Sequence, residues 1–118
     1  MKKILVVDDD VDILALVQMI LTMHDFSVDA ISKWENIPDS LVNFHPDLIL
    51  LDISLIGADG RIICKQLKQS NDSKDIPVIL FSANTEMGNN YREYQAEDFI
   101  AKPFEMAYLV KTIRHYVN

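Results

Sequence analysis

Four short apolar segments of this sequence end in side chains that could carry out chemistry. The segments at residues 3–7, 48–51, 76–81 and 98–101 are followed by Asp8-Asp9-Asp10, Asp52, Ser82 and Lys102, in that order. Carboxylates that lie close together repel one another by roughly 4 kcal/mol per close pair at an effective dielectric constant near 20. A hard divalent cation would neutralise them, and Mg²⁺ suits a site that offers a few carboxylates, water and a phosphate oxygen.

The same residue types suit the transfer of a phosphoryl group. With a metal ion beside it, the Asp52 carboxylate could act as a nucleophile and form an aspartyl phosphate. Lys102 would then balance the phosphoryl charge, and the Ser82 hydroxyl could donate a hydrogen bond to it. Each residue also has an ordinary structural interpretation: Asp52 could stop a strand, Ser82 could be a polar strand terminus, and Lys102 could form a structural ion pair.

The hydrophobic periodicity predicts alternating strands and helices. Strands are expected at residues 3–7, 26–31, 48–52, 76–81 and 98–101, and helices at 11–23, 37–44, 60–69, 86–95 and 106–117. The fourth helix contains Gly88-Asn89-Asn90 and little apolar periodicity, so it is expected to be short and mobile. Residues 53–59 are expected to form a loop, and Asp9 or Asp10 is expected to cap the first helix.

This order of elements predicts an α/β fold with a doubly wound, five-stranded parallel sheet, because crossovers between parallel strands are right-handed. The carboxyl ends of all strands then meet at one edge of the sheet, which is where such folds bind ligands. That edge would gather Asp8, Asp9, Asp52, Ser82 and Lys102, although they are far apart in the sequence.

Length and composition restrict the class of protein. The 118 residues fit one compact domain, residues 1–118, and 49% of them are hydrophobic. The net charge of −7 argues against direct nucleic-acid binding, which depends on cationic side chains. Apolar stretches are too short for a signal peptide or a bilayer span, so a cytoplasmic location without membrane association is expected. Cys64 is the one cysteine, which excludes an internal disulfide.

The ordered set of segments resembles the receiver domains of response regulators in two-component signalling, the CheY-like family, over essentially the whole chain. The matching segments are Ile4-Leu5-Val6-Val7-Asp8-Asp9-Asp10, Pro46-Asp47-Leu48-Ile49-Leu50-Leu51-Asp52, Asp59-Gly60, Ile76-Pro77-Val78-Ile79 with Ser82-Ala83, and Phe99-Ile100-Ala101-Lys102-Pro103-Phe104. The resemblance implies a flavodoxin-like sheet with strand order 2-1-3-4-5 and five helices. It also implies a cis peptide bond between Lys102 and Pro103.

The resemblance assigns roles to the residues at the sheet edge. Asp52 would accept a phosphoryl group from a sensor histidine kinase or a phosphotransfer protein, with Lys102 beside it. Mg²⁺ would be held by Asp8, Asp9, Asp52 and the backbone carbonyl of Ser54, with Asp8 acting through water.

The resemblance further implies a switch at Ser82 and Phe99. Phosphoryl oxygens would draw Ser82 inward and free the space into which Phe99 rotates. The face formed by the fourth helix, the fifth strand and the closing helix would then change. It would control a downstream protein or a C-terminal effector domain outside this sequence, or form a homodimer. The sequence departs from the family at Ile56, where proline is usual, and at Gln95, where glycine is usual.

Two other functions fit parts of the pattern. A phosphohydrolase that forms an aspartyl phosphate would use the same nucleophile, but such enzymes typically place a second Asp two residues later, where this chain has Ser54. A binding module could keep the fold without phosphorylation, although the complete acidic set argues against it. The sequence therefore predicts a phosphorylation-dependent signalling domain, and no turnover of an external substrate is expected.

Overall fold

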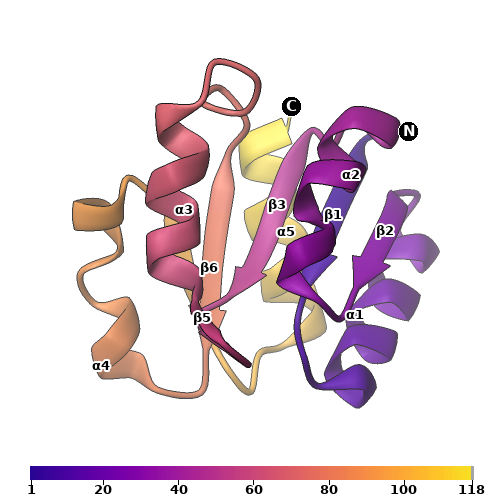
Figure 1. The fold of residues 1–118 in the computed structure, drawn as a ribbon. Helices are drawn as coiled ribbons and strands as arrows, with labels where there is room; N and C mark the ends of the chain where they lie inside the picture. Colours follow the sequence, from indigo (N-terminus) through magenta and orange to yellow (C-terminus); the bar gives the residue numbers. More distant parts are fainter. Residues whose placement is uncertain (118) are drawn as a thin grey trace.

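The computed structural model describes residues 1–117, which form a five-stranded parallel sheet with helices on both faces (Figure 1). In chain order the elements are β1 (Lys3–Val7), α1 (Val11–Met23), β2 (Ser27–Ile31), the 3₁₀ turn η1 (Trp34–Asn36), α2 (Ile37–Asn43), β3 (Leu48–Asp52), β4 (Ser54–Leu55), β5 (Ala58–Asp59), α3 (Gly60–Gln69), β6 (Val78–Ser82), α4 (Thr85–Gly88), the 3₁₀ turn η2 (Tyr91–Tyr94), β7 (Asp98–Ala101) and α5 (Met106–Val117). The sheet order is β2-β1-β3-β6-β7, which confirms the predicted order 2-1-3-4-5.

The central strands are the longest apolar runs of the sequence because both faces of the sheet are covered. Residues 4–7 of β1 and 48–51 of β3 are fully buried. β3 lies between β1 and β6, with Val7 beside Leu51 and Asp52 beside Phe81. A strand buried on both faces needs apolar side chains on both, and the first polar residue of β3 is therefore its last, Asp52.

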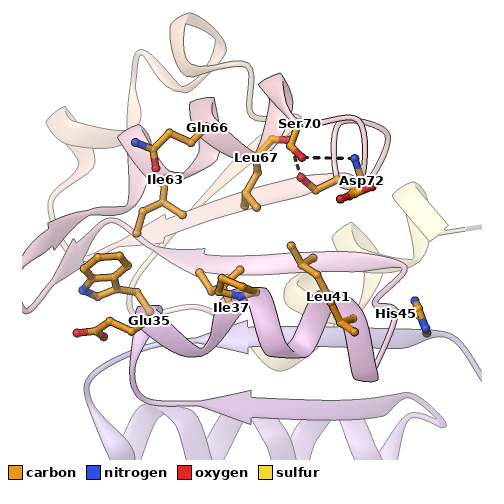
Figure 2. A pocket seen from close by; sticks show the side chains of 13 residues that line it. Glu35, Ile37, Leu41, His45, Ile63, Gln66, Leu67, Ser70 and Asp72 are labelled. Atoms are coloured by element: carbon orange, nitrogen blue, oxygen red, sulfur yellow. Dashed lines mark hydrogen bonds between the residues drawn. The ribbon is translucent and has the colours of Figure 1, made fainter.

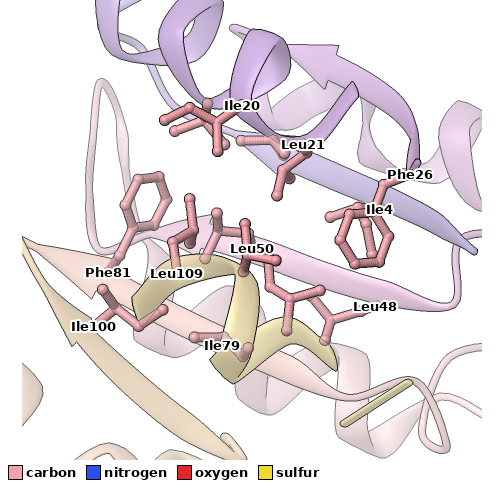
Figure 3. Packing of buried hydrophobic residues seen from close by; sticks show 14 of the residues in the cluster. Ile4, Ile20, Leu21, Phe26, Leu48, Leu50, Ile79, Phe81, Ile100 and Leu109 are labelled. Atoms are coloured by element: carbon pink, nitrogen blue, oxygen red, sulfur yellow. The ribbon is translucent and has the colours of Figure 1, made fainter. Parts of the chain in front are cut away.

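Two apolar cores lie on opposite faces of the sheet. On one face, α1 and α5 pack around residues such as Leu21, Leu50 and Leu109 (Figure 3). On the other face, α2 and α3 pack around Leu51 and Ile63. The side chains of neighbouring residues of one strand thus point into opposite cores, as those of Leu50 and Leu51 do. None of the helices that the structure describes is long and apolar enough to cross a membrane.

Most element boundaries predicted from the sequence agree with the structure to within two residues. α1, β3, α3, β7 and α5 have the predicted bounds. β2 begins at Ser27 instead of Phe26, which is buried in the apolar core. β6 begins at Val78 instead of Ile76, because Pro77 has no N–H group to donate to a neighbouring strand.

The prediction was wrong in two connecting segments. Residues 53–59 are not a plain loop but contain the antiparallel hairpin β4–β5, and Gly57 supplies its positive φ of 80°. The segment 86–95 is not one helix: α4 ends at Gly88 and η2 follows. Gln95 closes η2 with a φ of 67°, a conformation that glycine adopts at lower cost. The expectation that this helix would be short is confirmed.

A charged clamp that sequence reasoning missed joins α3 to β6 and β7. The Lys68 ammonium donates to both carboxylate oxygens of Glu97, at 2.7 and 3.0 Å, and to the Ile76 carbonyl at 2.8 Å. The Glu97 carboxylate also accepts from the Val78 N–H at 2.7 Å. The Lys68 side chain is only 7% exposed. The Lys68 ammonium is therefore paired at a largely buried position, and removing it would leave Glu97 without its ion-pair partner and lower the stability of the fold.

We expect Lys68→Met to lower the free energy of unfolding by about 2 kcal/mol, because it leaves Glu97 and the Ile76 carbonyl without their shared donor. Lys65→Met is the matched control, since Lys65 lies on the same helix and is exposed. It should change stability by less than about 0.5 kcal/mol. Urea unfolding of the two variants measures the difference, and equal losses would show that the clamp contributes nothing.

Candidate functional site

The predicted site residues lie where the parallel strands end, at the lower edge of the sheet in Figure 1. Asp8 directly follows β1, Asp52 is the last residue of β3, and Lys102 directly follows β7. Ser82 ends β6 and pairs with Ala101 of β7. The structure thus brings residues from four strands to one edge, as the topology requires.

Lys102 joins the two buried carboxylates of this edge. Its ammonium is 2.8 Å from Oδ2 of Asp8 and 3.4 Å from Oδ1 of Asp52. Asp8 is 1% exposed and Asp52 is 5% exposed. The peptide bond that follows Lys102 is cis, as predicted, and leads into Pro103. One ammonium is therefore shared by two carboxylates in a site with little access to water.

The charge of this group is not balanced. Burial is the main cause that raises the pKa of Asp52 from 3.8 to about 6, and repulsion from Asp8 adds to it. Attraction to Lys102 and a hydrogen bond from the Ser54 N–H, at 3.4 Å, act in the opposite direction. The site therefore holds more negative charge than its lysine compensates, and a divalent cation beside Asp52 would relieve the excess.

The remaining aspartates of the first cluster are engaged in local contacts. The Asp10 carboxylate accepts from the N–H groups of Asp12 and Ile13, so Asp10 is the cap of α1. The Asp10 N–H donates to Asp8 at 2.9 Å and orients that carboxylate. The Asp9 carboxylate accepts from the backbone N–H of Ile56 in the β4–β5 hairpin.

The predicted Mg²⁺ ligands match this geometry in part. Asp8 and Asp52 supply buried oxygen ligands with excess negative charge, which suits a hard cation. Within residues 1–117 no three His, Cys, Asp or Glu side chains are already arranged around a common metal position. Asp9 would have to exchange its hydrogen bond with Ile56 to join the other two carboxylates.

Ser82 connects the site to α4. It is 2% exposed, and its hydroxyl oxygen accepts from the Asn84 N–H at 3.0 Å. The Asn84 side chain in turn accepts from the N–H groups of Glu86 and Met87 and caps α4. A displacement of Ser82 would therefore be transmitted directly to the first turn of this helix.

Phe99 lies on β7 with its ring against α4. A Cβ atom added to Gly88 would be only 2.2 Å from the Phe99 ring, so the ring occupies the space that any larger residue at position 88 would need. The ring is half-buried and packs against the core shared with α3. The aromatic side chain at this predicted switch position thus lies between α4 and the core on the α3 side of the sheet.

Sequence reasoning missed three contacts near the site. Ile56 was noted only as a departure from proline, yet its N–H binds Asp9 and its carbonyl accepts from the Trp34 indole N–H at 3.2 Å. The Met87 sulfur lies 4.0 Å from the Ser54 hydroxyl and so places α4 beside the residues that follow Asp52. Backbone groups of Ile56 make two of these contacts and the long, flexible Met87 side chain makes the third, and none of the three leaves a signal in the sequence.

Comparison with known proteins gives one family. The family model for the response regulator receiver domain matches residues 4–114. The phosphate regulon transcriptional regulatory protein PhoB of Escherichia coli is 35% identical over 115 residues, which cover 96% of this chain and 50% of PhoB. The transcriptional regulatory protein ResD of Bacillus subtilis is 32% identical and is covered to 46%. The chain thus spans about half the length of these curated relatives.

Solved structures show the same fold. The receiver domain of NtrX from Brucella abortus has a TM-score of 0.87 and 30% identity, with 97% of each chain covered. The BeF3-activated receiver domain of RstA from Klebsiella pneumoniae has a TM-score of 0.87 and 28% identity, with 99% of each chain covered. Because the family model matches nearly the whole chain and the sheet order agrees, this chain belongs to the response regulator receiver domain family of two-component systems.

Proposed function

We propose that this receiver domain is a phosphorylation-dependent switch in which Asp52 accepts the phosphoryl group. The observation that carries the proposal is the buried group in which Lys102 lies between Asp8 and Asp52 at the carboxyl edge of the sheet. Its carboxylates carry excess negative charge, and its ammonium is placed to receive a new anion.

The transfer follows from the chemistry of these groups. An Asp52 carboxylate oxygen attacks the phosphorus of a phosphohistidine, supplied by a sensor histidine kinase or a phosphotransfer protein. The new O–P bond forms as the N–P bond breaks, and the imidazole nitrogen keeps the electron pair and takes up a proton from solvent. Lys102 already lies 3.4 Å from Asp52 and stabilises the charge of the phosphoryl oxygens.

Mg²⁺ is the proposed cofactor. Asp8, Asp9, Asp52 and the backbone carbonyl of Ser54 would hold it, and it would polarise and orient the phosphoryl group when bound. The support from this chain is the unbalanced charge of Asp8 and Asp52, which disfavours the ionised Asp52 in the absence of a cation.

We propose that Ser82, Phe99 and α4 convert phosphorylation into a change of surface. The Ser82 oxygen accepts a hydrogen bond from Asn84, so its own proton can be donated to a phosphoryl oxygen. Movement of Ser82 would disturb the N-terminal cap of α4, and the Phe99 ring would move away from its position against Gly88. The related RstA receiver domain has been solved in a BeF3-activated form, which supports an activated state for this family member as well.

The output acts through the face formed by α4, β7 and α5. The relatives PhoB and ResD are transcriptional regulators about twice as long as this chain, so an effector domain joined to it is one proposed target of the switch. A separate downstream protein or a second copy of the chain at this face are the alternatives. With a net charge of −7, the domain itself is proposed not to bind nucleic acid.

We expect acetyl phosphate and Mg²⁺ to label the native protein with one alkali-labile phosphoryl group, and Asp52→Asn to abolish the labelling because Asn lacks the nucleophilic oxygen. Asp47→Asn is the matched control, since Asp47 lies at the opposite end of β3 and is exposed. Intact-mass measurement distinguishes the variants. Persistent labelling of Asp52→Asn would assign the phosphoacceptor elsewhere, and rapid release of phosphate with turnover would favour a phosphohydrolase.

The raised pKa of Asp52 predicts a specific pH dependence of stability in the presence of a chelator. Between pH 3.8 and about 6 the folded state holds a proton that the unfolded state releases, so stability falls as pH rises through this window. Asp52→Asn removes the effect and should be more stable than the native protein above this window, by about 1–3 kcal/mol. The difference should vanish below about pH 4. A constant difference across the range would contradict the raised pKa.

We expect Gly88→Ala to displace the Phe99 ring, because the added Cβ would lie 2.2 Å from it. The substitution should destabilise the unphosphorylated protein by about 1–3 kcal/mol and increase hydrogen exchange in α4. Phe99→Leu shortens the side chain that is in the way, so the double variant should lose less stability than the sum of the single variants. Additive losses would show that Gly88 and Phe99 do not constrain one another.

A further inference from the structure

A groove separates α2 from α3 on the face of the sheet opposite α1 and α5 (Figure 2). Its volume is about 830 Å³. Pockets that bind small molecules typically measure roughly 300–1,000 Å³. Ile37 and Leu41 of α2 form one wall, and Ile63 and Leu67 of α3 form the other. Trp34 also lines the groove. The groove therefore has the size and the apolar walls of a small-molecule site.

Hydrogen bonds within the chain hold both ends of this α2–α3 groove. At one end the Trp34 indole N–H donates to the Ile56 carbonyl at 3.2 Å. At the other end the buried Ser73 hydroxyl donates to the Leu67 carbonyl at 2.7 Å and fixes the turn after α3. The walls are thus formed before any ligand arrives, which reduces the ordering cost of binding.

Carboxylates outnumber the other ionisable side chains of the groove. The ionisable side chains that line it are Glu35, His45 and Asp72, and among the described lining residues none is Lys or Arg. Glu35 lies at one end of the groove, and His45 and Asp72 lie at the other (Figure 2). The face of the Trp34 indole beside Glu35 adds a surface that attracts cations.

We propose that the α2–α3 groove is a binding site for a small organic cation, a molecule with an apolar body and an ammonium or guanidinium end. The apolar body would lie between the walls formed by Leu41 and Leu67, with its charged end toward Glu35. Because the groove has the volume of a drug-sized ligand and ionisable side chains lie at both of its ends, a small molecule fits it better than a helix of a partner protein.

Ile56 connects this groove to the sheet edge. Its carbonyl accepts from Trp34 in the groove wall, and its N–H donates to the Asp9 carboxylate. A ligand that shifts Trp34 would therefore change the hydrogen bonding of Asp9. This coupling rests on the proposed function, in which Asp9 binds Mg²⁺. If one ligand alters the affinity for the other, the effect must be reciprocal.

The single tryptophan provides the measurement, because Trp34 is the only one in the chain and lines the groove. We would titrate residues 1–118 with 4-phenylbutylammonium, 4-phenylbutanol and 4-phenylbutanoate, which share an apolar body and differ in charge. The ammonium compound should give a saturable change of Trp34 fluorescence and bind about threefold to fivefold more tightly than the alcohol. The carboxylate should bind more weakly than the alcohol. Equal binding of all three, or no saturable change, would overturn the proposal.

Two matched pairs of variants locate the site. Gln66 lines the groove and Gln69 does not, although both are exposed on α3. Gln66→Arg should weaken binding of the ammonium compound at least tenfold, whereas Gln69→Arg should leave it within twofold. Glu35→Gln should remove the preference for ammonium over alcohol, and Glu93→Gln, at a residue that does not line the groove, should keep it. Equal effects within either pair would place the ligand elsewhere and overturn the assignment.

The coupling has its own measurement. Saturating 4-phenylbutylammonium should change the Mg²⁺ affinity of the native protein at least twofold, measured by calorimetry, and should leave Gln66→Arg unaffected. An unchanged Mg²⁺ affinity, with the groove occupied, would overturn the coupling through Ile56. Absence of Mg²⁺ binding in the free protein would instead contradict the proposed cofactor, while the fluorescence titration continues to test the groove alone.

Discussion

The sharing of one ammonium by two buried carboxylates is the constraint on which this structure depends. Asp8 and Asp52 are almost completely buried, and Lys102 lies 2.8 and 3.4 Å from them. Burial and the Asp8 charge raise the pKa of Asp52 to about 6, so the folded chain is destabilised when Asp52 ionises. The fully buried strands β1 and β3 hold these residues together despite that cost, since their apolar side chains anchor the sheet edge.

The helix that follows Ser82 at this sheet edge is short. α4 comprises only Thr85–Gly88, and its cap Asn84 is bound to the Ser82 hydroxyl. A helix this short gains little from its own hydrogen bonds and depends on side-chain contacts at its ends. The Phe99 ring supplies one such contact at Gly88. Small changes at the sheet edge can therefore alter α4 without disturbing the central strands.

The sequence predicted the features that follow from periodicity and missed those that depend on single contacts. Residues 48–52 could be assigned because a strand buried on both faces requires an unbroken apolar run, and the position of Asp52 followed from topology. The β4–β5 hairpin could not be assigned, since two-residue strands have no periodicity. The clamp between Lys68 and Glu97 was missed because it joins residues 29 positions apart through rotamers that no local pattern encodes.

The two faces of the sheet differ in a way that suits a switch. On one face, the apolar core is covered by α1 and α5, which are both long, continuous helices. On the other, α3 is accompanied by the short helices α2 and α4. Trp34, Met87 and Phe99 are partly buried around the core of this face, as Phe104 and Tyr116 are on the first face. Since short helices gain little from their own hydrogen bonds, conformational change is cheaper on the face that carries α2 and α4. The N–H and carbonyl groups of Ile56 bind Asp9 and Trp34, so the sheet edge is connected to the α2–α3 groove on this same face.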